Sequence, residues 1–491
     1  MLKTEYVGNA VLVLTVVLFI IFYEGNWYHI ENLMAHKNLI IGLADNGLSW
    51  QHFKSIIFNG EYFDNNPSRF RSISHIFELF DHTQYSNLQR VFGYNYVLNI
   101  PSNLFYLFFS IFFLIQLFKK QSYFFLGLII IILSSTLFLS DLFFLLRPGK
   151  KIAIVFSLSL LYLAENNRIK QNIKVYLFSF LLFLAISCDE EFLYLFPFLS
   201  LYYIYINHSF ISQKELKEFI YLNIVILALF IYLTLFKNQS AYFNGISYQK
   251  NLANVIHTGV NFELFFDYLI YLQDTFFFMI FGVNKKLVGF IFLFFILYIN
   301  LKLTDKYYYF KIEKFIFIIF LIISYLIYQT TLELFGGNIV LRSIGYYYGS
   351  TKIIIFILIL CIYKFELNQI FKHTFNNNLK KIYGFIICFI VTVSNLNNFH
   401  NAHHLNNLMH YKFTNVKELN QKISELKQNI QSNLVLDQLY ISKIDNMDKI
   451  EYLLSKLNIN NENNIELISR YNNMIPKKDL IEYESFLFKD L

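Results

Sequence analysis

The sequence predicts an all-α polytopic membrane protein, and three observations lead to that fold class. Hydrophobic residues make up 56% of the 491 residues, aromatic residues 20% and charged residues only 15%, and the mean hydropathy is +0.43. The apolar residues form about eleven runs, which a bundle of transmembrane helices explains. Polar residues are concentrated in one long early loop and in the C-terminal part. This composition excludes an ordinary soluble domain of this length.

The apolar runs define a transmembrane domain over residues 1–397, followed by a small, mainly helical domain over 398–491. The first run, 9–23, has no small-residue cleavage site after it, so we expect a retained span and not a signal peptide. A large first outer loop with surface helices follows at 24–95. The other expected spans are 96–118, 123–145, 152–164, 175–187, 192–206, 219–236, 287–301, 315–328, 353–363 and 382–393.

The basic residues set the expected orientation. With the N-terminus in the cytoplasm, every second gap between spans carries lysine or arginine, as at Lys119, Arg168 and Lys214. This is the positive-inside pattern, and it places the first loop and the C-terminal domain outside. We therefore attribute the formal net charge of +7 to topology and expect no nucleic-acid partner.

One basic cluster breaks this pattern. Arg147, Lys150 and Lys151 fall in a gap that the same topology puts outside. A cation that orientation does not require can bind an anion. A plain hairpin turn, made from Pro148 and Gly149, explains the segment equally well.

The long polar stretch from Asp45 to Ser102 contains two amphipathic runs. Asp45 stands before the first run, and an arginine-rich turn with Arg69 and Arg71 precedes the second run, 73–80. Apolar residues at helical spacing, with polar residues between them, are typical of helices that lie on a membrane surface. An equally simple role for Asp45 is to cap the first of these helices.

The order of these motifs resembles that of GT-C-type membrane glycosyltransferases, the superfamily of the protein O-mannosyltransferases and the lipid A aminoarabinose transferase. The resemblance covers residues 1 to about 400. The segments that carry it are Asp45-Asn46, Gln51–Phe58, Ser68–Phe80 and Val91–Ser102. Asn46 stands where the family has a second acidic residue, and Arg71-Ser72-Ile73 replaces its proline pair.

The resemblance implies a GT-C-like bundle that uses a polyprenyl-phosphate-linked sugar as donor and a lipid, glycan or protein as acceptor. It also implies a site on the extracytoplasmic face of a bacterial inner or plasma membrane. Asp45 is the expected catalytic base, with Glu24 and Glu31 as alternatives. In the loop ELFGGNIVLRSIGYYYGS, Arg342 matches an arginine that lies near the donor phosphate in the family.

The residues themselves suit this chemistry. Arginine and lysine hold phosphate and stabilise charge on a leaving group, while a carboxylate accepts the proton of an attacking hydroxyl. The expected substrate-binding residues share a positive charge and an outer location: Arg69, Arg71, Arg147, Lys150, Lys151 and Arg342.

Other polar groups have simpler explanations. The acidic run after Cys188 (Asp189, Glu190 and Glu191) is expected to form a solvated turn, because lipid-exposed carboxylates are costly. Four histidines between 400 and 410 form no metal-ligand pattern with a carboxylate. We expect no certain cofactor, although a divalent cation is possible, and the expected partners are the lipid-linked donor and membrane lipids. The oligomeric state stays open.

Two other functions remain as alternatives. A transporter of lipid-linked oligosaccharide should show matching repeats or broken helices in two halves, and no such repeat is found. A polymerase or ligase of surface polysaccharide would have long late loops, whereas this chain has a long first loop.

Overall fold

The structure is a computed structural model that describes residues 14–20, 27–29, 49–51, 53–54, 73–81, 101–119, 123–143, 148–232, 314, 316–325, 344–374, 378–406 and 410–412. Within these ranges the chain is almost entirely helical. The helices are α5 (Pro101–Phe118), α6 (Tyr123–Ser134), α7 (Thr136–Phe143), α8 (Pro148–Glu165), α9 (Gln171–Cys188), the 3₁₀ helix η2 (Glu190–Leu193), α10 (Phe196–Asn207), α11 (Gln213–Ile231), α17 (Ile344–Thr374) and α18 (Asn378–Asn406). Shorter helical segments occupy 14–20, 73–81 and 316–325.

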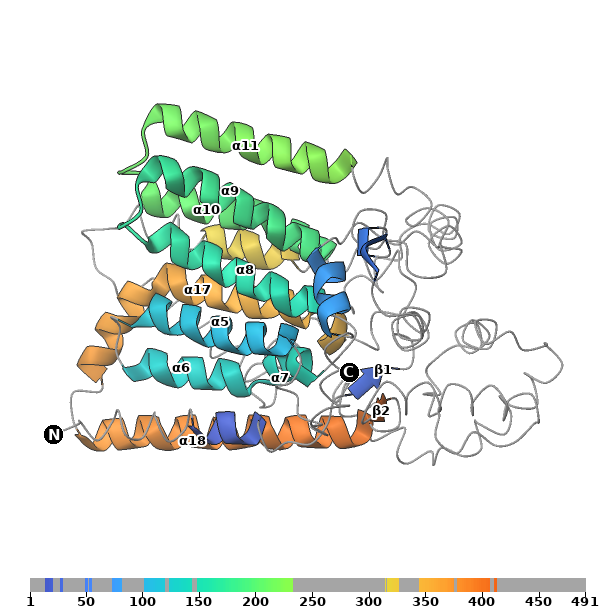
Figure 1. The fold of residues 1–491 in the computed structure, drawn as a ribbon. Helices are drawn as coiled ribbons and strands as arrows, with labels where there is room; N and C mark the ends of the chain where they lie inside the picture. Colours follow the sequence, from blue (N-terminus) through green and yellow to red (C-terminus); the bar gives the residue numbers. More distant parts are fainter. Residues whose placement is uncertain are drawn as a thin grey trace, which may run out of the picture.

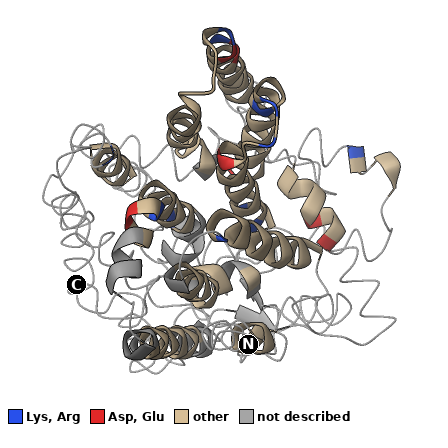
Figure 2. Ribbon diagram, turned by 90° about the vertical axis from the view of Figure 1, so that its left-hand side faces the viewer, with Lys and Arg blue, Asp and Glu red and all other residues tan. Residues whose placement is uncertain are grey.

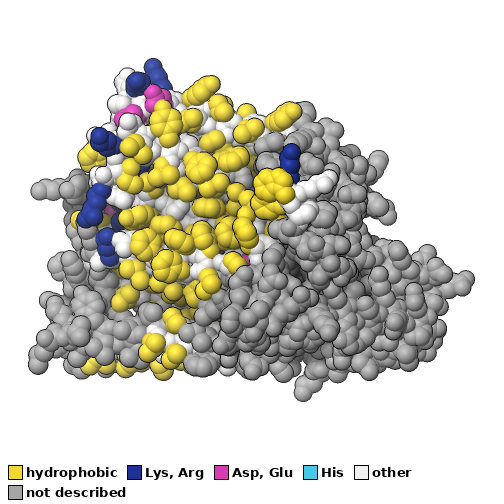
Figure 3. Space-filling view, viewed as in Figure 1, with side chains coloured by type: hydrophobic (Ala, Val, Ile, Leu, Met, Phe, Trp, Pro, Cys, Tyr) yellow, Lys and Arg dark blue, Asp and Glu magenta, His cyan; other side chains and the backbone are white. Residues whose placement is uncertain are grey.

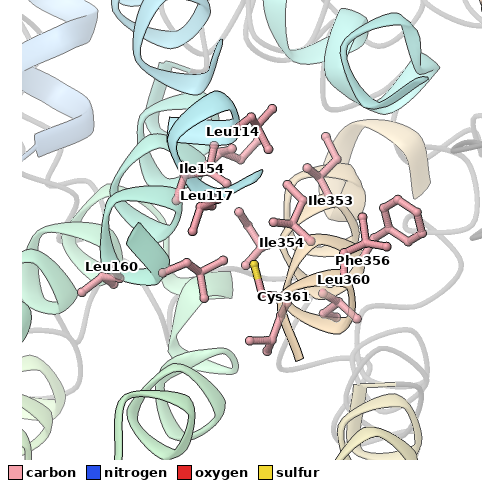
Figure 4. Close-up of a cluster of buried hydrophobic side chains, with 14 of the residues drawn as sticks. Leu114, Leu117, Ile154, Leu160, Ile353, Ile354, Phe356, Leu360 and Cys361 are labelled. Atoms are coloured by element: carbon pink, nitrogen blue, oxygen red, sulfur yellow. The ribbon is translucent and has the colours of Figure 1, made fainter. Parts of the chain in front are cut away.

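Helix α8 lies at the centre of the bundle and packs against α5, α9, α10 and α17 (Figure 1). Its contacts with α5 and α17 include an apolar cluster. Leu114 of α5, Ile154 of α8 and Ile354 of α17 are all buried and point into one cluster (Figure 4). Close packing of this kind fixes the relative positions of the three helices.

Among the helices that the structure describes, α5 and α9 are long and apolar enough to cross a membrane. Helix α5 shows how the apolar residues are distributed. Its large exposed side chains, Leu104, Phe108, Phe112 and Ile115, recur every three to four residues and so form one face. Its buried positions include Ser102, Asn103 and Ser110. The apolar face therefore points outward and much of the polar face inward, the reverse of a soluble helix.

The same arrangement extends over the neighbouring helices. Figure 3 shows one side of the bundle covered by hydrophobic side chains, with lysine and arginine along one edge. Figure 2, which views the helices nearly end-on, shows few acidic or basic residues on their ribbons. A continuous apolar surface of this extent marks a membrane or protein contact.

The observed helices agree with most of the expected spans that fall on described residues. The expected span 123–145 differs, because it is divided into α6 and α7 at Ser135. The Ser135 hydroxyl donates to the carbonyl of Ile132 at 2.6 Å and accepts the backbone N–H of Phe138 at 3.3 Å. A serine that bonds to the backbone in this way ends one helix and begins the next.

One expected span lies outside the described residues, and one helix is longer than the sequence predicts. The expected span at 287–301 lies outside them, so the number of about eleven spans stays a prediction. Helix α18 continues to Asn406, past the start of the expected C-terminal domain at 398.

A short antiparallel pair of strands joins distant parts of the sequence. Strand β1 (Trp27–His29) belongs to the first expected outer loop, and β2 (His410–Lys412) follows α18. Trp27 pairs with Lys412 and His29 with His410. The segments after the first expected span and after α18 therefore lie together.

Hydrogen bonds and ion pairs connect the helices at one end of the bundle, which we call the Lys174 end. The Lys174 ammonium of α9 donates to the carbonyl of Ala164 at 3.0 Å and to Oδ1 of Asn207 at 2.7 Å. Nearby, Glu165 of α8 forms an ion pair with Lys364 of α17. These bonds hold the end of α8 against α9, α10 and α17.

Candidate functional site

The opposite end of the bundle, which we call the Lys151 end, contains a second group of buried polar side chains. Helices α5 and α8 both begin here and α9 ends here. The helix 73–81 lies beside them (blue, right side of Figure 1). Both Lys150 and Lys151 are buried, with exposed fractions of 2% and 0%. Buried charges of this kind require compensation from neighbouring groups.

The two lysines belong to the first turn of α8. Pro148 is the first residue of this helix, a position where proline costs no hydrogen bond and has a suitable backbone angle. The expected hairpin turn at 147–151 is therefore wrong for residues 148–151, which are helical. The Lys151 ammonium donates to Oδ1 of Asn103, in the first turn of α5, at 2.5 Å.

The position of these lysines is electrostatically unfavourable for the helix. The N-terminus of an α-helix carries a partial positive charge, so cations there are repelled and anions are attracted. Two buried lysines in the first turn of α8 must therefore be balanced by carboxylates or by a bound anion.

Carboxylates come from the helix 73–81, whose polar face points into the bundle. Glu78 has an exposed fraction of 5%. It accepts a hydrogen bond from the hydroxyl of Ser74 at 2.9 Å, and Nδ1 of His75 lies 3.1 Å from its other oxygen. Positions 74, 78 and 81 fall on one face of a helix, so Asp81 points in the same direction.

Asp81 connects this helix to the start of α5. Its Oδ1 accepts the backbone N–H of Ser102 at 2.8 Å, and its Oδ2 accepts the Ser102 hydroxyl at 2.5 Å. Burial raises the pKa of Asp81 from 3.8 to about 6, although the positive charge of Lys151 and the two bonds from Ser102 act in the opposite direction. A carboxyl group with this pKa can both hold and release a proton near neutral pH.

Close packing at Gly149 holds the helix 73–81 against the bundle. A Cβ atom at this position would lie 2.5 Å from the carbonyl oxygen of Cys188 and 2.7 Å from the hydroxyl oxygen of Ser74. Only glycine permits this approach without movement of the neighbours. The ring of Phe77 also packs against Phe105 of α5, with centroids 5.3 Å apart.

Asp189, directly after α9, adds a third carboxylate at this end. Its exposed fraction is 2%, so the expectation of a solvated turn is wrong for this residue. The described groups of the site are therefore two lysines and three carboxylates (Glu78, Asp81 and Asp189), together with His75.

The structure describes two of the seven residues that the sequence predicts for the site. Lys150 and Lys151 are in it, and they lie side by side in α8. The others lie outside the described residues: Asp45, Arg69, Arg71, Arg147 and Arg342. The alternatives Glu24 and Glu31 also lie outside them.

Sequence reasoning missed the acidic members of the site. The run 73–80 was expected to lie on the membrane surface, whereas its polar face is buried against α5 and α8. The spacing of Ser74, Glu78 and Asp81 on one helix face was the signal that could have indicated it.

Comparisons with protein-family models, with curated proteins and with solved structures give no match for this chain. The functional argument therefore depends on the residues of the site and their geometry. Among the described residues, no group of three or more histidine, cysteine, aspartate or glutamate side chains is arranged to hold a metal ion.

Proposed function

We propose that this protein is an integral membrane glycosyltransferase of the GT-C type. It transfers a sugar from a polyprenyl-phosphate-linked donor to a lipid, glycan or protein hydroxyl on the extracytoplasmic face. Its transmembrane domain has about eleven spans, and its site lies at the Lys151 end.

One observation carries this proposal: two buried lysines occupy the first turn of α8 next to a buried carboxylate. Lysines bind phosphate as point charges. The helix N-terminus adds backbone N–H groups and a partial positive charge that favour the same ligand. A phosphate at this position would be attracted by Lys150, Lys151 and the N-terminus of α8 together.

The distribution of charge and loops supports the outward orientation. The Lys174 end carries the exposed cations Lys119, Arg168, Lys170, Lys214 and Lys217, as expected of a cytoplasmic edge. The helix 73–81 and the strands β1 and β2 lie toward the opposite end (Figure 1). All three elements belong to segments that the sequence analysis expects outside.

The proposed reaction is a substitution at the sugar's anomeric carbon. The acceptor's oxygen forms a bond to that carbon while the bond from carbon to the phosphate oxygen breaks. The electron pair of the broken bond leaves with the polyprenyl phosphate, whose negative charge Lys150 and Lys151 stabilise. The acceptor's proton goes to a carboxylate, for which Asp45 is the sequence-based candidate.

The test uses a product that does not depend on the identity of the acceptor. Purified protein in detergent is incubated with short-chain polyprenyl phosphates that carry different hexoses and pentoses, together with a membrane extract as the source of acceptor. We expect release of polyprenyl phosphate with at least one donor. Release should fall at least tenfold in Lys151→Ala, a loss of one charge-assisted bond, and stay unchanged in Lys170→Ala, an exposed lysine at the other end.

A transporter is the alternative that a specific observation favours, because the break between α6 and α7 resembles the discontinuous helices of that class. In sealed vesicles a transporter would move the intact lipid-linked sugar between leaflets. Translocation without release of polyprenyl phosphate would reject the transferase and establish transport.

A further inference from the structure

We propose that Asp81 controls how strongly the Lys151 end holds phosphate, because its deprotonated carboxylate competes with the phosphate for the positive charge of Lys151. This inference rests on the proposed function and adds a regulatory residue to the same site. Protonation of Asp81 removes the competing charge and strengthens donor binding. Deprotonation weakens binding and favours release of the polyprenyl phosphate after transfer.

The geometry connects the two groups through the first turn of α5. Asp81 binds Ser102 through both of its oxygens, at 2.8 Å and 2.5 Å. Asn103, the next residue, accepts the hydrogen bond from Lys151 at 2.5 Å. One turn of one helix therefore holds the carboxylate and the ammonium on adjacent residues. The charge of Lys151 acts on Asp81, so a phosphate that binds Lys151 also lies near Asp81.

The charges around Asp81 come from each element packed against it. Its own helix contributes Glu78 and His75, α8 contributes Lys150 and Lys151, and the segment after α9 contributes Asp189, all of them buried. The Lys151 charge favours the ionised form of Asp81, while Glu78 and burial favour the protonated form, and burial dominates. With Asp81 ionised, three carboxylates stand against two lysines. With Asp81 protonated, two carboxylates stand against two lysines. An incoming anion meets less repulsion in the second state.

The coupling has a definite sign. A bound phosphate is a further negative charge, so it raises the pKa of Asp81, and by reciprocity protonated Asp81 binds phosphate more tightly. Two like charges that both act on Lys151 repel each other through the protein interior, and we expect this repulsion to change binding by about tenfold. Binding should therefore strengthen as the pH falls through about 6.

The test measures binding and not turnover, so it separates this inference from the proposed function. The probe is dihexyl phosphate, which, like the proposed donor, is a phosphodiester with one negative charge from pH 5 to pH 8. Binding to the purified full-length protein in detergent is measured by calorimetry, with uncharged trihexyl phosphate as the control ligand. We expect the wild type to bind dihexyl phosphate about tenfold more tightly at pH 5 than at pH 7.5.

Two variants isolate Asp81. In Asp81→Asn, which keeps an acceptor and a donor for Ser102, affinity should equal the low-pH value of the wild type at every pH. In His75→Gln the pH dependence should persist, which matters because a histidine also changes charge in this interval. The inference is overturned if the pH dependence of binding is unchanged in Asp81→Asn. It is also overturned if the pH dependence disappears in His75→Gln and not in Asp81→Asn.

A measurement on the wild type alone guards against a variant that fails to fold. Calorimetry at pH 6.5 in two buffers with different ionisation enthalpies reports how many protons are taken up when dihexyl phosphate binds. The inference requires net proton uptake, and zero uptake overturns it. If dihexyl phosphate binds at no pH, or binds no better than trihexyl phosphate, the phosphate site itself is wrong and the proposed function falls with it.

Discussion

Replacement of Asp81 by asparagine tests the buried carboxylate through stability, independently of any ligand. The pKa of this group is raised from 3.8 to about 6 in the folded protein. The folded state therefore binds its proton more tightly than the unfolded state. As the pH rises from about 4 to about 6, the unfolded state ionises first, and the free energy of unfolding falls.

The magnitude follows from the two pKa values. The interval from 3.8 to about 6 corresponds to about 3 kcal/mol of destabilisation above pH 6 relative to an uncharged group. About 2 kcal/mol of this falls between pH 4.5 and pH 7.5, because the unfolded carboxyl group is already largely ionised at pH 4.5. Asparagine carries no charge at any pH, so Asp81→Asn should gain about 2 kcal/mol over the wild type across this interval.

The assay is chemical unfolding in a mild detergent at pH 4.5, 5.5, 6.5 and 7.5, with the free energy extrapolated to zero denaturant for both proteins. Ser102→Ala is the matched control, because it removes one hydrogen bond to Asp81 but leaves the carboxyl group buried. This control should be less stable at every pH and keep a pH dependence at least as steep as that of the wild type, because the bond that is lost lowers the pKa of Asp81. Parallel curves for the wild type and Asp81→Asn would refute the reasoning.

Three further predictions concern packing. Gly149→Ala should lower the free energy of unfolding by about 1–3 kcal/mol, because the new methyl group meets the backbone at Cys188 and the side chain of Ser74. Faster amide exchange over residues 73–81 would show that this helix has moved. Unchanged exchange and stability would contradict the close approach. Glu165→Gln should lower the free energy of unfolding by about 1–3 kcal/mol, because Lys364 loses its carboxylate partner. Glu165→Asp, which keeps the charge, should lower it less. A loss below about 0.5 kcal/mol would mean that solvent screens the pair. Ile354→Ala should cost about 2–5 kcal/mol in the core around α8, and a cost near zero in thermal unfolding would mean that the core collapses around the cavity.

The sequence was sufficient to predict the helices of the bundle, because their signal is local. Helix α9 (Gln171–Cys188), for example, contains the expected apolar run 175–187 and begins one turn before it. The break at Ser135 could not be predicted in this way. Serine is common within apolar helices, and only the bonds to Ile132 and Phe138 show that this one ends a helix.

The site was predictable only in part, for a physical reason. Lys150 and Lys151 stood out because they violated a rule about charge and topology, which needs no knowledge of neighbours. Asp81 violated nothing in the sequence: a carboxylate at the end of a polar helix face is ordinary. Its importance arises from burial against Ser102, and this contact between residues in different elements has no local signal.

The two ends of α8 differ in how a buried lysine interacts with the helix dipole. At the last turn of α8, Lys174 of α9 donates to the carbonyl of Ala164. The helix carries a partial negative charge at this end, which stabilises a cation. At its first turn, Lys150 and Lys151 sit where the same helix repels them. A lysine placed with the dipole is accounted for by structure alone, since it caps carbonyl groups and joins helices. Lysines placed against the dipole need negative charge close by, and Glu78, Asp81 and Asp189 are buried at the same end of the bundle.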